Sequence, residues 1–172
     1  MMKKFFSLQT ILCVVLMAFS AAARADEPRE IGKFGDWSAY VFMEDGNKVC
    51  YMASQPKKDE GGYTRRGEIF ALVTHRPAEG SKDVFSYIAG YPYKGGSDAT
   101  VSIDSDKFTL FTQDDTAWAP DAAMDSKISE ALRKGSKMTV KGTSSRGTQT
   151  TDTFGLGGSG AAHDAINKEC GI

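Results

Sequence analysis

Residues 136–170 read SKMTVKGTSSRGTQTTDTFGLGGSGAAHDAINKEC, and this stretch decides between two kinds of fold. Gly142 and Gly147 have the G-x-x-x-x-G spacing of a phosphate-binding loop. A G-x-G-x-x-G pattern, the spacing of a dinucleotide-binding motif, begins at Gly155 and precedes a helix-like segment. These glycines indicate either a nucleotide site in an α/β fold or turns in a β-rich fold.

Neither nucleotide motif is complete. A phosphate-binding loop requires Lys and then Ser or Thr after its second glycine, but Thr148 and Gln149 occupy those positions. A dinucleotide-binding motif requires a second strand and an acidic residue about 20 positions further on. Only 12 residues (172 − 160) follow Gly160, so no second strand can form. We interpret the glycines as a turn between two strands and a hinge into a C-terminal helix.

The rest of the chain has the pattern of an antiparallel β protein. Short alternating or apolar runs are separated by Gly, Asp or Pro, as in DWSAYVFME, where Trp37, Ala39 and Val41 share one face. Strands do not alternate with helices, which disfavours a doubly wound sheet and predicts a mainly β, antiparallel sandwich. The predicted strands cover residues 36–44, 48–54, 67–75, 83–93, 99–104, 107–113, 136–143 and 148–156.

Two short helices interrupt this pattern. DSKISEALRKG, residues 125–135, has a candidate N-cap in Asp125 or Ser126 and a terminal glycine. SGAAHDAINKEC, residues 159–170, has an apolar residue at every fourth position up to Cys170. We therefore expect Cys170 to lie on the face of the last helix that packs against the strands.

The first 25 residues are typical of a secretory signal peptide. Lys3 and Lys4 precede an apolar core that is too short to span a bilayer, and A-R-A ending at Ala25 fits a cleavage site. We therefore expect residues 1–25 to be removed on export to the periplasm, the outer surface or the medium.

The remaining 147 residues (172 − 25) are enough for one domain with a sizeable core. We expect a flexible leader over residues 26–33 and a single β-sandwich domain over 34–172. The mature chain carries 18 basic and 22 acidic residues, a net charge of −4. Electrostatics therefore gives no reason to expect nucleic acid or anionic lipid as a partner. No later apolar run is long enough to span a membrane.

The cysteines predict a disulfide. Cys13 leaves with the signal peptide, so the mature chain keeps Cys50 and Cys170. In an exported chain such a pair favours a bond between the two. The alternatives are two separate thiols, or a metal site that also uses His75 and His163, although no C-x-x-C spacing supports a metal. We expect no metal and no cofactor.

No catalytic motif stands out. His75 in VTHRP is a conceivable general base, with Ser144, Ser145 or Asp121 as distant companions, but a lone histidine at a strand end is more often structural. The aspartates of DSDK and QDD are typical of turns, and DSDK lacks the later glycine and glutamate of a calcium loop. We expect the protein not to be an enzyme.

Aromatic residues and one arginine are candidates for a binding surface. Tyr91 and Tyr93 lie in GYPYKGG, a predicted exposed loop, and Trp118 follows a predicted strand. Tyr and Trp often anchor interfaces, although such rings are more typical of a sandwich core. Arg146 lies at the tip of the turn between the last two strands. With His75, these residues form the candidate binding surface.

Six segments recur in the order of a known family. They are FGDW (34–37), CYMASQP (50–56), VTHRP (73–77), AGYPY (89–93), FTLFTQDDTAWA (108–119) and LRKGSKMTVKGTSSRGTQTTDTF (132–154). Over residues 34–170 the chain resembles the invasion-associated locus B family of exported alphaproteobacterial proteins. The resemblance implies an immunoglobulin-like β-sandwich in the periplasm or on the outer surface, and a link to host-cell invasion. It implies no catalytic residue and no cofactor.

We therefore expect an exported cell-envelope protein with a non-catalytic binding or structural role and a contribution to host-cell invasion. Its partner would be an envelope or host-surface protein, or a glycan. One alternative is a periplasmic module that binds glycan or lipid through an aromatic cleft of Tyr91, Tyr93 and Trp118. The other is an envelope hydrolase that uses His75.

Overall fold

The computed structural model describes residues 27–172, so the predicted signal peptide lies outside the described residues. Within this range no helix is long and apolar enough to cross a membrane. The strands are β1 (Arg29–Phe34), β2 (Trp37–Glu44), β3 (Asn47–Ser54), β4 (Lys58–Gly61), β5 (Phe70–Arg76), β6 (Ser81–Ile88), β7 (Ala99–Ile103), β8 (Asp106–Gln113), β9 (Thr116–Trp118), β10 (Lys137–Thr143) and β11 (Gln149–Gly155). The helices are α1 (Ala122–Lys134), α2 (Ser159–Cys170) and a short 3-10 turn (Pro77–Glu79).

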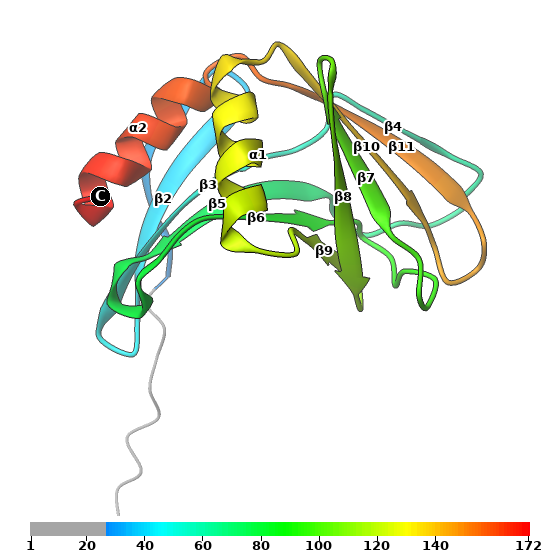
Figure 1. The fold of residues 1–172 in the computed structure, drawn as a ribbon, viewed down its shortest axis with the longest axis horizontal. Coiled ribbons are helices and arrows are strands. Elements are labelled where there is room, and N and C mark those ends of the chain that lie inside the picture. Colours follow the sequence, from blue (N-terminus) through cyan, green and yellow to red (C-terminus); the bar gives the residue numbers. More distant parts are fainter. Residues whose placement is uncertain (1–26) are drawn as a thin grey trace, which may run out of the picture.

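One antiparallel sheet folds back on itself to make two layers (Figure 1). Its strand order is β1-β2-β3-β5-β6-β9-β8-β7-β10-β11-β4. Strand β8 belongs to both layers, because residues 106–110 pair with β7 and residues 111–113 pair with β9. The mainly β, antiparallel fold with two short helices is therefore confirmed. The layers are continuous through β8, whereas an immunoglobulin domain has two separate sheets.

The core lies between the two layers and under the helices. Trp37, Ala39 and Val41 of β2 are buried, as the alternation predicts, and they pack in one cluster with Val140 of β10 and Phe154 of β11. The alternation therefore sets which face of each strand points inward, since successive side chains point to opposite faces.

Three strands were not predicted, and one of them corrects the expected leader. From Arg29 onward the chain is paired with β2 and is not a flexible leader. The sequence REIGKF lacks a period of two, but Ile31 and Phe34 pack against the core. Strand β4 has only exposed residues and β9 has three residues, so neither carries a hydrophobic pattern that predicts a strand.

The start of helix α1 is fixed by a side-chain N-cap, and the start of helix α2 follows a glycine with a left-handed backbone. Helix α1 starts one turn earlier than predicted, because the Asp121 carboxylate accepts a hydrogen bond from the Met124 amide. Asp125 is instead buried and accepts a hydrogen bond from the Phe85 amide of β6 at 2.9 Å. Helix α2 has the predicted bounds and follows Gly158, whose backbone is left-handed and so close to the Phe34 carbonyl that no Cβ fits there.

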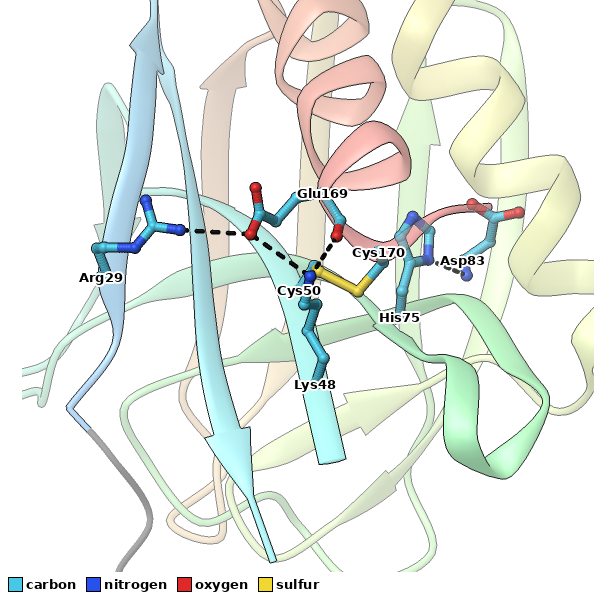
Figure 2. The surroundings of a disulfide bond; sticks show 7 residues. All are labelled: Arg29, Lys48, Cys50, His75, Asp83, Glu169 and Cys170. Carbon is cyan, nitrogen blue, oxygen red and sulfur yellow. Dashed lines mark hydrogen bonds and ion pairs between the residues drawn. A yellow bond between two sulfur atoms is a disulfide. The ribbon is translucent and has the colours of Figure 1, made fainter. Parts of the chain in front are cut away.

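The Cys50–Cys170 disulfide is formed and fastens α2 to β3 (Figure 2). The two Cα atoms are 6.0 Å apart, across a sequence separation of 120 residues. Cys50 is fully buried, and Lys48 and Arg29 form ion pairs with Glu169 beside it. The end of the chain is thus attached to the middle of the larger layer.

We predict that the Cys50→Ala/Cys170→Ala variant has a free energy of unfolding lower by about 4–5 kcal/mol, because the disulfide removes the closure entropy of a long loop from the unfolded chain. Urea denaturation of oxidised wild type, reduced wild type and the variant measures this. Reduced wild type should match the variant. Mass spectrometry of the non-reduced exported protein should show a cross-linked peptide, and two free thiols there would contradict the pairing.

Candidate functional site

A concave site of about 540 Å³ lies where three turns meet. It is formed by the segment after β4, the turn after β6 and the turn between β10 and β11. We call it the arginine–tyrosine cleft. Its lining residues are Gly62, Tyr63, Thr64, Arg65, Arg66, Gly67, Gly90, Tyr91, Pro92, Ser144, Ser145, Arg146, Thr148 and Thr150. A volume of this size is typical of a small-molecule site.

Arg66 forms the base of the cleft. Its guanidinium makes a two-point contact with the Asp152 carboxylate of β11, at 2.7 and 2.6 Å. Its Nε donates to the Ala89 carbonyl at 2.7 Å, and Nη2 also donates to the Tyr87 hydroxyl of β6 at 3.1 Å. The side chains of Arg66 and Asp152 are 4% and 0% exposed, so this is a buried ion pair that joins the two layers.

The surrounding groups keep Arg66 charged and Tyr87 protonated. Burial by itself lowers the pKa of Arg66, but Asp152 and Tyr87 outweigh it and raise that pKa. Burial and then the Asp152 charge raise the pKa of Tyr87, so its hydroxyl stays protonated and donates to the Asp152 carboxylate. Each charge has compensating hydrogen bonds, which a buried ion pair requires.

Two tyrosines flank the Arg66 guanidinium and form the walls of the cleft. The guanidinium carbon lies 4.9 Å from the ring centre of Tyr91 and 5.3 Å from that of Tyr63. The Tyr91 hydroxyl is hydrogen-bonded to Thr150 at 2.6 Å, and the Tyr63 hydroxyl donates to Asp59. Both rings are held at two points, so the cleft is preformed.

The rim of the cleft is positively charged. Arg65 and Arg146 are exposed, and neither forms an ion pair within residues 27–172. Every charged residue that lines the cleft is an arginine, although the chain as a whole has a net charge of −1. Since Asp152 neutralises Arg66, the free charge of the cleft comes from the two rim arginines.

The structure brings together two of the five predicted surface residues. Tyr91 and Arg146 both line the cleft. Tyr93 is 7% exposed and packs edge-on behind Tyr91, with 5.3 Å between ring centres, so its ring is not on the surface. Trp118 is half-buried in β9 beside Phe111, and it does not line the cleft. The aromatic cleft expected from Tyr91, Tyr93 and Trp118 is therefore not formed.

Sequence reasoning missed Tyr63, Arg65 and Arg66. These residues lie in YTRRG (63–67), a segment without a strand or helix pattern. An aromatic residue beside two arginines in such a segment is typical of a binding loop, and this composition could have identified the segment from the sequence.

His75 lies at the opposite end of the larger layer, beside the disulfide (Figure 2). It is fully buried, and its Nδ1 accepts a hydrogen bond from the Asp83 amide at 3.0 Å. His75 is therefore not part of the predicted binding surface. A histidine without exposed atoms also gives no support to the hydrolase alternative.

His75, Asp83 and His163 place potential ligand atoms within 4.8 Å of one another, which invites comparison with a metal site. The Asp83 carboxylate is hydrogen-bonded to Nε2 of His163 at 2.7 Å. The side-chain amide of Asn167 lies 3.1 Å from Nδ1 of the same ring. Because His75 Nδ1 accepts an amide proton, its own proton is on Nε2, where a metal would have to bind. With these hydrogen bonds, the three side chains are poorly suited to bind a metal ion. The alternative that joined both cysteines to the histidines is excluded, since the cysteines form the disulfide.

Comparison with known proteins relates the chain to one family. The family model described as "Invasion associated locus B (IalB) protein" matches residues 37–167. Among solved structures, the crystal structure of invasion associated protein b from Bartonella henselae has a similar fold, with a TM-score of 0.54 and 15% identity. That similarity covers 84% of this chain and 97% of the Bartonella chain, and at this identity it supports the fold alone. No curated protein matches the chain.

We predict that Asp152→Asn lowers the free energy of unfolding by about 3–5 kcal/mol, because it leaves the buried charge of Arg66 without its partner. Urea denaturation measures the loss. Arg66→Met should cost a similar amount, and the double variant Arg66→Met/Asp152→Asn should cost much less than the two separate changes together. Arg146→Ala is the control and should change stability by less than about 0.5 kcal/mol. Additive losses in the double variant would contradict the coupling.

We also predict that the protein loses stability as the pH falls below about 6.5. Burial lowers the pKa of His75 below its unfolded value of 6.5, so the unfolded chain takes up this proton first. The contribution is complete above pH 6.5 and is lost as the pH falls toward the folded pKa. His75→Asn keeps an acceptor for the Asp83 amide and should flatten this part of the curve, measured by urea denaturation from pH 8 to 5. Identical slopes for both proteins would contradict the prediction.

Proposed function

Because the chain belongs to the invasion-associated locus B family, we propose that it is an exported, non-catalytic binding protein of the bacterial cell envelope. The observation that carries the proposal is the arginine–tyrosine cleft, a preformed concavity whose charged residues are all arginines. Binding sites are commonly built on loops that a rigid scaffold positions, and this cleft is formed by three turns of a disulfide-linked sandwich.

Two features support export. The sequence predicts a cleavable signal peptide over residues 1–25. The Cys50–Cys170 disulfide is of the kind that persists in oxidising compartments such as the periplasm or the cell surface. The family's name and that of the Bartonella protein connect both to invasion, which supports a role in invasion of host cells.

The composition of the cleft supports binding without catalysis. Within residues 27–172, the only residues lining the cleft that are of a type used in general acid–base chemistry are Tyr63 and Tyr91. The hydrogen bond to Asp59 raises the pKa of Tyr63 and burial raises the pKa of Tyr91, so neither hydroxyl is a base at neutral pH. Ser144 accepts a hydrogen bond from the Thr148 amide at 3.2 Å, and no histidine of the described range 27–172 lines the cleft to act as its base. The cleft residues can hold a ligand through charge, hydroxyl groups and aromatic rings.

We predict that a deletion strain recovers host-cell invasion when it carries the wild-type gene but not when it carries Arg65→Ala/Arg146→Ala. The wild-type protein and the Arg65→Ala/Arg146→Ala variant should be exported equally, because the two arginines are exposed and unpaired within residues 27–172. Cell fractionation with immunoblotting measures export, and counts of intracellular bacteria measure invasion.

Arg29→Ala/Arg133→Ala is the matched control, since it also removes two arginines, each of which forms only an exposed ion pair. It should restore invasion fully. Retention of the wild-type protein in the cytoplasm would overturn the envelope assignment. Normal invasion by the cleft variant would overturn the role of the cleft.

A further inference from the structure

We propose that the arginine–tyrosine cleft binds an acidic saccharide, with the anionic group of the sugar against Arg65 and Arg146. This inference rests on the proposed function, since it names the class of ligand for the same site. It is argued from the charge, the unused hydrogen-bond donors and the shape of the cleft.

The charge of the cleft selects an anion. Asp152 balances Arg66, whereas Arg65 and Arg146 have no carboxylate partner within residues 27–172. A guanidinium presents a planar fork of N–H groups that matches carboxylate, sulfate or phosphate oxygens. Two such forks on separate turns, one after β4 and one between β10 and β11, line the same cleft and can both approach a single anionic group.

Arg66 retains a donor for the same ligand. An arginine has five N–H groups, and the hydrogen bonds of Arg66 use one on Nε, one on Nη1 and two on Nη2. The hydrogen bonds to Asp152, Ala89 and Tyr87 within residues 27–172 leave the second N–H of Nη1 unused, and the Tyr63 side chain also interacts with the guanidinium. A buried donor of this kind gains an acceptor when an oxygen of the ligand enters the cleft.

The other lining groups favour a hydroxylated ligand over an apolar one. Thr64, Ser145 and Thr148 offer hydroxyl groups, and among the residues that the structure describes the Pro92 ring is the only aliphatic group lining the cleft. An acyl chain or an apolar peptide anchor would therefore have no pocket to fill. The faces and edges of Tyr63 and Tyr91 can contact the C–H groups of a sugar ring while its hydroxyls bond to the polar residues.

The cleft needs little reorganisation to accept such a ligand. The Tyr63 and Tyr91 hydroxyls are already bonded to Asp59 and Thr150. The turns are joined by backbone hydrogen bonds, from Gly67 to Gly90 at 2.8 Å and from Ser145 to Pro92 at 2.7 Å. Binding therefore orders mainly the two rim arginines, which limits its entropic cost.

Calorimetry on the mature, oxidised protein tests this class of ligand. The probes are an oligogalacturonate that carries carboxylates, a heparin-derived oligosaccharide that carries sulfates, a neutral dextran oligosaccharide, inorganic phosphate and a mononucleotide. We expect one or both acidic oligosaccharides to bind, the preferred one identifying the anionic group, and affinity to fall as salt rises. Arg65→Ala/Arg146→Ala should weaken binding by at least about tenfold for each arginine removed.

Two further variants sharpen the test. Arg146→Lys keeps the charge but loses the fork and should bind with intermediate affinity. Arg29→Ala/Arg133→Ala should bind like wild type. Equal binding of acidic and neutral oligosaccharides, tighter binding of phosphate or the nucleotide, or unchanged affinity in the cleft variant would each overturn the proposal.

The outcomes separate this inference from the proposed function. If the cleft variant fails to restore invasion and no acidic oligosaccharide binds, the ligand class is wrong and the role of the cleft in invasion stands. If acidic oligosaccharides bind at the cleft but the cleft variant restores invasion fully, the ligand class stands and the role in invasion is wrong.

Discussion

The buried ion pair between Arg66 and Asp152 is the interaction on which the binding end of the molecule depends. It connects the segment between β4 and β5 to β11, and the Tyr87 hydroxyl of β6 joins it from the larger layer. Removing two charges from water is costly, so such a pair persists only when its remaining donors and acceptors are bonded. The Ala89 carbonyl and the Tyr87 hydroxyl meet that need, and they fix the direction of the guanidinium. The tyrosines that form the cleft walls are packed against this fixed plane.

A second set of constraints holds the other end of the molecule. Helix α2 lies on the opposite side from β4, β10 and β11 (Figure 1). The Cys50–Cys170 disulfide fastens its last residue, and His163 bonds to Asp83 of β6 in its middle. Arg133 of α1 pairs with Asp164 on its exposed side. Because these contacts share no residue with the cleft, substitutions there should change stability without changing the shape of the cleft directly.

The contacts that fasten α2 lie at one end of the molecule and the cleft lies at the other, so stability and binding depend on different residues. The sandwich core and the fastened helix supply a rigid scaffold, and the three turns at one end supply groups that are open to a ligand. Continuity of the sheet through β8 links the two layers covalently and by hydrogen bonds, so the turns that form the cleft come from a single framework. The glycines that resemble nucleotide motifs serve this framework: Gly147 has a left-handed backbone in the β10–β11 turn, and at Gly155 a Cβ would collide with the Asp36 carboxylate before the chain enters α2.

The sequence by itself determined the features that depend on local pattern or on counting. Alternation in β2, the bounds of α2 and the pairing of two cysteines could be predicted because side-chain period, glycine positions and cysteine number are visible along the chain. Only the tertiary structure decided that Arg66 is buried whereas its neighbour Arg65 is exposed, since the partner of Arg66 is 86 residues away. The same holds for His75, Tyr93 and the short strands β1, β4 and β9. His75, Tyr93 and β4 are buried or paired through strands far away in the sequence. Strands β1 and β9 form hairpins with the neighbouring β2 and β8, but their short segments carry no periodic hydrophobic pattern that predicts a strand.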